Sequence, residues 1–159
     1  MTGITVSEKA ASNGSRRLRR RTLVASVAVV GALVLSGCWS ENQQKDMDFI
    51  NQSRGSGRRA LNGDDALMQK AQAWAEHMSR TGVLEHTGGG NKINTSGISN
   101  WCAVGENVGY GSSTMAVHNA FMASSGHRAN ILGNYDRVGT GVVRVGSVVW
   151  VSEIYVRSC

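Results

Sequence analysis

Two histidines and one glutamate carry the clearest chemistry in this 159-residue sequence: His86, Glu106 and His127. Two neutral imidazoles and one carboxylate can bind Zn²⁺ in a three-ligand site that leaves the fourth position to water. Without a metal, the carboxylate can hydrogen-bond one histidine and fix its tautomer, so that an imidazole acts as a general base near neutral pH. Metal-ligand spacing alone does not bring the three together, so the elements that carry them must do so.

The first histidine follows the longest predicted helix. That helix spans residues 64–80, with Asp64 or Asn62 as its N-cap and Gly82 as its stop. Apolar residues at helical spacing form one stripe along it: Leu67, Ala71, Trp74 and Met78. His77 and His118 lie on this helix and the next one, and we expect both to be solvated rather than functional.

The remaining elements complete an α+β order. A short helix is expected over 46–54, a Gly-, Asn- and Ser-rich loop over 87–100, and a strand over 104–110. A second helix over 114–124 begins at Ser113 and ends at Gly126, and one further helical turn covers 127–132. Residues 138–157 read as a β-hairpin around Gly146-Ser147. This order predicts a layered α+β domain with an antiparallel sheet.

Composition and charge exclude several classes of protein. Hydrophobic residues make up 41% of the chain and charged residues 18%, with 20 glycines and no proline, which fits one globular domain rather than a disordered chain. The net charge of +6 invites a nucleic-acid interpretation, but residues 1–37 hold six of the 17 basic and one of the 11 acidic residues. The rest is nearly neutral, so no nucleic-acid surface is expected.

The first 38 residues are similar to a bacterial lipoprotein signal. A basic region, Arg16–Arg21, precedes the apolar run Leu23–Leu35, which is too short to span a bilayer. Residues 35–38 (LSGC) resemble the lipobox, in which a cysteine is diacylated and becomes the mature N-terminus. We expect a signal peptide over 1–37, lipidation of Cys38 and a polar linker over 38–45. The alternatives are an ordinary signal peptide or an uncleaved signal anchor.

The export route stays open, because residues 20–24 (RRTLV) also resemble a twin-arginine signal. General secretion and twin-arginine export both place the domain, residues 46–159, outside the cytoplasm. The membrane partner is then reached through the acyl chains on Cys38, at the extracytoplasmic face of the bacterial cell membrane. A secreted form is the alternative.

The two other cysteines suit such a compartment. Cys102 and Cys159 are an even pair in an oxidising location, so a disulfide between them is expected, and two free thiols are the alternative. The bond would tie the last residue to the domain, with a chain-entropy contribution of about 4 kcal/mol.

Three segments in fixed order carry a family resemblance. They are Leu84-Glu85-His86-Thr87, Gly105-Glu106-Asn107-Val108, and Gly126-His127-Arg128-Ala129-Asn130-Ile131-Leu132. Together they resemble the CAP superfamily (cysteine-rich secretory, antigen 5 and pathogenesis-related proteins), in particular its bacterial SCP-like extracellular branch. The resemblance runs from about Met47 to Tyr155.

The resemblance implies a three-layer α-β-α sandwich with a central antiparallel sheet and a cleft. Carried over by position, His86, Glu106 and His127 line that cleft, with Asn107 and Ser124 beside them. His86 and His127 are the metal candidates, with Zn²⁺ as the expected ion if one binds. The same three residues are the catalytic candidates, none of them assigned. Asn107 and Asn130 are expected to hydrogen-bond backbone.

One position departs from the family pattern. Many relatives have a second glutamate on the helix before the second histidine, where this chain has Ser124. A mechanism that needs paired carboxylates is weakened by that change. Glu106 has a purely structural alternative, in which it accepts hydrogen bonds from backbone N–H groups of the cleft loops.

Two classes of function follow, and the sequence favours the first. One is a non-enzymatic binding module whose cleft takes a lipid, small-molecule or protein ligand. The other is a hydrolase, peptidase-like, that uses His86, Glu106 and His127 with or without Zn²⁺. A passive structural protein of the envelope is a third interpretation. A family resemblance alone does not decide among them.

Overall fold

A four-stranded mixed sheet forms the centre of residues 39–159, the part of the chain that the computed structural model describes. The expected signal peptide and the lipidation site Cys38 lie outside the described residues. The strand order is β1-β3-β4-β2, with bounds β1 (Asn62–Gly63), β2 (Ala103–Gly111), β3 (Arg137–Val145) and β4 (Val148–Arg157). The pairs β2–β4 and β3–β4 are antiparallel, as predicted. The short β1, which pairs with β3 in parallel, was not predicted.

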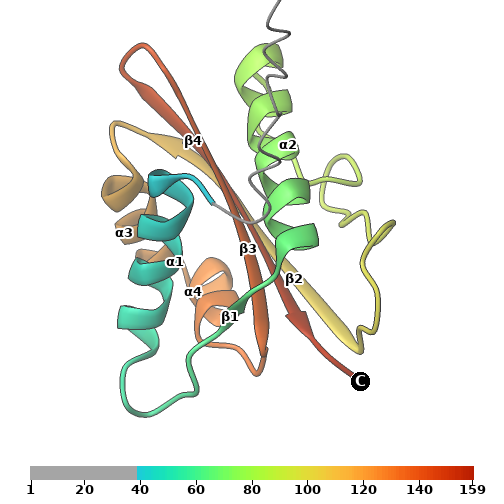
Figure 1. The fold of residues 1–159 in the computed structure, drawn as a ribbon. Helices are drawn as coiled ribbons and strands as arrows, with labels where there is room; N and C mark the ends of the chain where they lie inside the picture. Colours follow the sequence, from blue (N-terminus) through green and yellow to red (C-terminus); the bar gives the residue numbers. More distant parts are fainter. Residues whose placement is uncertain (1–38) are drawn as a thin grey trace, which may run out of the picture. The chain divides into compact units, whose positions relative to one another are not determined.

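Helices cover both faces of this sheet and make the expected three layers. Figure 1 shows α2 on one side of the strands and the other three helices on the opposite side. The helices are α1 (Glu41–Arg54), α2 (Asp65–Thr81), α3 (Thr114–Ala123) and α4 (Ser125–Ile131). The α+β sandwich expected from the sequence is therefore the observed fold.

The long helix α2 begins and ends at the residues that the sequence indicated. Asp64 caps it, because its carboxylate accepts a hydrogen bond from the Leu67 N–H at 3.1 Å. Gly82 ends it in the left-handed conformation, at φ 69°. Leu67, Ala71 and Met78 of the predicted stripe are buried, whereas Trp74 is half-buried.

Two glycines of β3 allow α2 to lie directly on the sheet. A Cβ atom at Gly139 would collide with the backbone of Leu67, and one at Gly141 would collide with the backbone of Ala71. The contact between helix and strand is therefore backbone against backbone. It fixes the position of α2, and with it the start of the loop that leads to His86.

Helix α1 corrects the expected linker. It starts at Glu41 instead of residue 46, so residues 41–45 are helical. Ser40 and Gln43 form a reciprocal capping box, a helix-start signal that lies within the segment expected to be a polar linker. Gln43 is buried because its amide donates to the Met68 and Thr140 carbonyls at 3.3 and 2.8 Å.

Two further helix predictions need correction. Helix α3 ends at Ala123 with Ser124 as its C-cap, and Gly126 lies inside α4 instead of stopping α3. His118 of α3 is not solvated: it is 5% exposed, and its Nε2 lies 2.8 Å from Ser53 Oγ. Burial lowers its pKa below 6.5. The burial of His118 could not be predicted, because the polar–apolar pattern of α3 is weak and does not indicate that α1 covers this helix.

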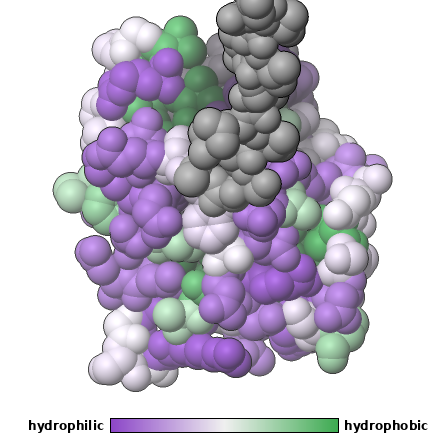
Figure 2. Space-filling model, viewed as in Figure 1, coloured by the Kyte–Doolittle hydropathy of each residue, from purple (hydrophilic) through white to green (hydrophobic). Residues whose placement is uncertain are grey.

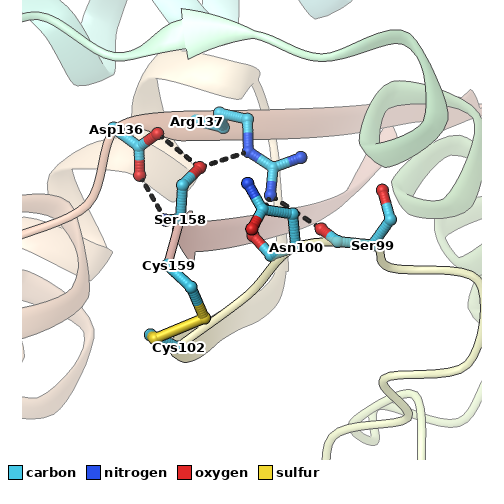
Figure 3. The surroundings of a disulfide bond; sticks show 7 residues. All are labelled: Ser99, Asn100, Cys102, Asp136, Arg137, Ser158 and Cys159. Carbon is cyan, nitrogen blue, oxygen red and sulfur yellow. Dashed lines mark hydrogen bonds between the residues drawn. A yellow bond between two sulfur atoms is a disulfide. The ribbon is translucent and has the colours of Figure 1, made fainter.

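A disulfide joins Cys102 to Cys159, as predicted, and closes the C-terminal end of the sheet. Figure 3 shows the polar contacts beside it. Arg137 donates to the carbonyls of Ser99 and Asn100 at 2.9 Å each, and Asp136 accepts from the Ser158 N–H and hydroxyl at 2.7 Å each. The end of the long loop and the end of the last strand are thus held together at the same end of the sheet.

The outer surface is largely polar on the side seen in Figure 2, where hydrophobic colour gathers mainly toward the turn between β3 and β4. Within residues 39–159, no helix combines the length and apolar character that crossing a bilayer requires.

Gly141→Ala should destabilise the domain strongly, because the new methyl group must displace the α2 backbone. We expect a loss of about 2–3 kcal/mol in the free energy of unfolding, measured by urea denaturation. Gly57→Ala is the matched control, since nothing lies within 4 Å of its added Cβ. Equal stability of the two variants would show that α2 does not require the glycine.

Candidate functional site

Glu106 and His86 form the central contact of the site. Glu106 lies on β2 with its side chain fully buried, and its Oε2 is 2.9 Å from His86 Nδ1. The same oxygen accepts the backbone N–H of Thr87 at 3.1 Å. A carboxylate only accepts hydrogen bonds, so His86 donates from Nδ1, and in the neutral tautomer with that bond Nε2 carries the lone pair. Glu106 therefore serves both roles expected from the sequence: it orients a histidine and holds a loop.

His127 approaches from the opposite side of the sheet. It lies on α4, and its ring contacts Phe121 with centroids 4.9 Å apart. Burial lowers the pKa of His127 below 6.5, and the neighbouring charge of His86 lowers it further. The two histidines are thus near enough to interact electrostatically, and His127 is a neutral imidazole near neutral pH.

Asn107 is buried and holds α4 in place. Its side chain therefore does not line the cleft. Its side chain is fully buried, and its Nδ2 donates to the His127 carbonyl at 3.2 Å and to Glu153 Oε2 at 2.8 Å. Asn130 Nδ2 donates to Asn107 Oδ1 at 2.9 Å and to the Glu106 carbonyl at 3.1 Å. The expectation that Asn107 faces the cleft was wrong, because this network takes its amide into the interior.

Glycines on β2 allow the helices to approach this strand. A Cβ at Gly105 would lie 2.7 Å from Asn130 Oδ1 of α4, and one at Gly109 would lie 2.7 Å from the Phe121 ring of α3. The alternation of glycines with Asn107 along β2 is the sequence signal for a strand face that touches helices. The apolar pattern that predicted a strand here does not carry that information.

An apolar groove runs along β2 beside these residues. Its volume is about 260 Å³. Loop, strand and helix residues line it together: Leu84, Val108, Gly109, Tyr110, Val117, Ala120, Phe121, Ser124 and His127. Of the five predicted cleft residues, Ser124 and His127 line this groove, while His86, Glu106 and Asn107 do not.

Ser124 brings no acid–base partner to the groove. It terminates α3 and precedes α4, and its hydroxyl makes no capping hydrogen bond. No hydrogen bond joins Ser124 to His127 among the described residues, so the serine is not arranged as an activated nucleophile. This position therefore carries a small neutral side chain and not the second carboxylate that the family resemblance would imply.

The predicted three-ligand zinc site is not assembled by the described residues. Within 39–159, no three His, Cys, Asp or Glu side chains converge as a ligand set. Glu106 lies behind His86, on its Nδ1, and so supports that imidazole instead of standing beside it as a ligand. His86 and His127 remain as a pair of imidazoles.

A buried acid cluster adjoins the site, and the sequence analysis did not predict it. Asp46 of α1 and Glu153 of β4 are both fully buried, and Tyr155 donates its hydroxyl to Glu153 Oε2 at 2.5 Å. Both Asp46 carboxylate oxygens and Glu153 Oε1 have no partner among the described residues. Burial raises the pKa of Glu153 to about 7 and, together with the charge of Glu153, raises that of Asp46.

A match to a known protein family covers most of the sequence. Residues 16–155 match the family described as CAP, the cysteine-rich secretory protein family. The chain belongs to the CAP family. No curated protein matches the sequence.

Several solved structures share the fold at low sequence identity. An outer surface protein from Borrelia burgdorferi is 18% identical, with a TM-score of 0.63 over 73% of this chain and 95% of that one. An extracellular SCP-domain protein from Bacillus anthracis is 22% identical, with a TM-score of 0.61 over 74% of this chain and 40% of that one. NaASP2, solved with Zn²⁺, is 13% identical, with a TM-score of 0.56 over 75% of this chain and 83% of that one.

His127 of this CAP domain should titrate below 6.5, and His86→Ala should raise its pKa because a neighbouring positive charge is removed. In the natural chain, the lowered pKa means that His127 binds a proton more readily in the unfolded state than in the folded state. Its contribution therefore reduces the free energy of unfolding as pH falls below 6.5. NMR titration of the histidine Cε1–H signals measures the pKa, with His77→Ala as control. An unchanged His127 pKa in His86→Ala would contradict the proximity of the two rings.

Glu153→Gln should change how stability depends on pH. Because the folded pKa of Glu153 is raised from 4.5 to about 7, its stabilising protonated form is lost as pH rises through that interval. Glutamine mimics that protonated form, so the stability of the variant relative to the natural chain should increase between about pH 5 and about pH 8. Urea midpoints at both pH values measure this change. The exposed Glu76→Gln should show none.

Proposed function

We propose that this CAP-domain chain is an envelope-anchored bacterial binding module whose β2 groove takes the apolar part of a small amphiphilic ligand. The observation that carries the proposal is the groove itself. Apolar side chains line most of its length, and Ser124 and His127 supply polar atoms. Ligand pockets of proteins combine an apolar lining with a few polar groups in this way. At about 260 Å³ the groove suits a short acyl chain or a comparable small group.

The residues beside the groove support binding over turnover. Glu106 already accepts hydrogen bonds from His86 and from the Thr87 backbone, and its Oε1 is buried. A second carboxylate is missing, since Ser124 occupies the place where many CAP relatives carry one. The neutral His127 can still donate or accept one hydrogen bond from a ligand's polar end.

The cell-surface location is the second part of the proposal. The Borrelia relative is named an outer surface protein and the Bacillus relative an extracellular protein. For this chain we propose lipidation at Cys38 and residence at the extracytoplasmic face of the bacterial cell membrane. Ser40 caps α1 two residues after Cys38, so the domain would lie close to the bilayer.

A hydrolase is the alternative, and one observation favours it. In the neutral form of His86, the hydrogen bond from Nδ1 to Glu106 leaves the lone pair on Nε2, as a general base requires. NaASP2 was solved with Zn²⁺. In the hydrolase alternative, His86 and His127 of this chain would contact a Zn²⁺ ion through their two imidazoles. Turnover of peptide or ester substrates that disappears in His127→Ala would support it over the binding module.

Filling the groove should abolish binding of an acyl probe. Ala120 is exposed on α3 and lines the groove, so Ala120→Trp occupies the space without removing a core contact. With the full lipidated chain in phosphatidylcholine nanodiscs and a photoreactive short-chain fatty acid, crosslinks to residues 108–127 should fall by about tenfold in this variant. Peptide mass spectrometry locates and counts the crosslinks.

Ala116→Trp is the matched control, because Ala116 is exposed one turn earlier on the same helix and does not line the groove. It should retain crosslinking at the natural level. If both tryptophan variants crosslink like the natural chain, or if the probe labels no residue of the groove, the proposed ligand site is wrong.

A further inference from the structure

Four arginines surround a second cavity, which shares no lining residue with the groove. Its volume is about 340 Å³, and it lies where the end of α1, the α1–β1 loop, the α4–β3 connection and the end of β4 meet. Its charged and hydroxyl-bearing lining residues are Arg54, Arg58, Arg59, Tyr135, Asp136 and Arg157. The α1–β1 connection is seen at the lower edge of Figure 1, and the same region of Figure 2 shows pale colour beside strongly hydrophilic colour.

Arg54 is the buried arginine of this cavity, and hydrogen bonds hold its side chain in the wall. Only 5% of its surface is exposed, and its guanidinium donates from Nε to the Arg59 carbonyl at 2.8 Å. Its Nη1 donates to the carbonyls of Ile131 and Gly133 at 2.7 and 2.9 Å. These bonds fix the guanidinium in the cavity wall and shape the loop that carries the next two arginines.

The other three arginines line the same cavity. Burial lowers the pKa of Arg54, and the charge of nearby Arg58 lowers it further. Burial raises the pKa of Tyr135, and the charge of Arg157 opposes that rise, so Arg157 is close to the tyrosine. Among residues 39–159, none of the four arginines forms an ion pair.

The single carboxylate in the wall is already engaged. Both Asp136 oxygens accept hydrogen bonds from Ser158, at 2.7 Å each, and the charge of Arg137 also lowers the pKa of Asp136. The cavity therefore has four positive charges against one occupied negative charge, in a concave space. Guanidinium groups with free N–H donors in such a space match the geometry of phosphate oxygens.

We propose that this arginine cavity is a binding site for a phosphate group. The ligand is a phosphoryl compound with a small organic part, either free in solution or as the headgroup of an anionic phospholipid. Tyr135 and the arginine N–H groups donate hydrogen bonds to the phosphate oxygens, and the cavity volume leaves room for the organic part. Arg54 acts as a fixed donor, while Arg58, Arg59 and Arg157 close around the bound anion.

Calorimetry on the full chain in neutral detergent micelles tests this site. The first arm titrates inorganic phosphate at constant ionic strength of about 0.1 M. Arg58→Ala/Arg59→Ala and, separately, Arg157→Ala should each weaken phosphate binding by about tenfold. Arg54 is left intact, because three backbone carbonyls depend on it. The control Arg80→Ala/Arg144→Ala removes the same charge from exposed positions outside the cavity and should bind like the natural chain.

The second arm separates the two sources of phosphate. It replaces inorganic phosphate by mixed micelles that contain phosphatidylglycerol, with phosphatidylcholine as reference. Binding of free phosphate with no preference for phosphatidylglycerol supports the site with a soluble ligand, and preference for phosphatidylglycerol that the cavity variants lose supports a headgroup. No binding in either arm, or an equal loss in the Arg80/Arg144 control, would overturn the proposal.

Discussion

The candidate site depends on the alternation of two neighbouring residues on one strand. Side chains along a strand point to opposite faces, so Glu106 and Asn107 serve opposite layers of the sandwich. Glu106 holds His86 and the loop that follows α2, and Asn107 holds the backbone of α4 at His127. Two histidines from different layers are brought together because β2 lies at the edge of the sheet, where both layers are within reach.

This arrangement explains why the two histidines alone do not imply one particular chemistry. A carboxylate that accepts two hydrogen bonds is a positioning group, and its burial keeps it away from a ligand in the groove. The groove itself is apolar except at Tyr110, Ser124 and His127. The shape and lining of the groove are the basis for proposing a ligand there, and the pair of imidazoles is the basis for the hydrolase alternative.

The net charge of the chain does not show where its charged side chains gather. Residues 38–159 are close to neutral overall, yet four arginines from α1, its following loop and β4 gather in one cavity. A nearly neutral chain argues against an extended surface for a polyanion, and it is still consistent with one concave site for a single phosphate. Asp46 and Glu153 are the opposite case, because two acidic side chains are buried and burial raises the pKa of each, which favours the neutral, protonated forms.

Local patterns in the sequence determined most of the secondary structure, the cysteine pairing and the family. Caps, stops and apolar spacing are local properties, so α2, the hairpin and the α+β order were predictable, and the capping box at Ser40 was also readable. The tertiary structure alone decided that Asn107 and His118 are buried, that Glu106 stands behind His86, and that distant arginines share a cavity. Those outcomes depend on contacts between residues far apart in the chain, for which spacing in the sequence carries no signal.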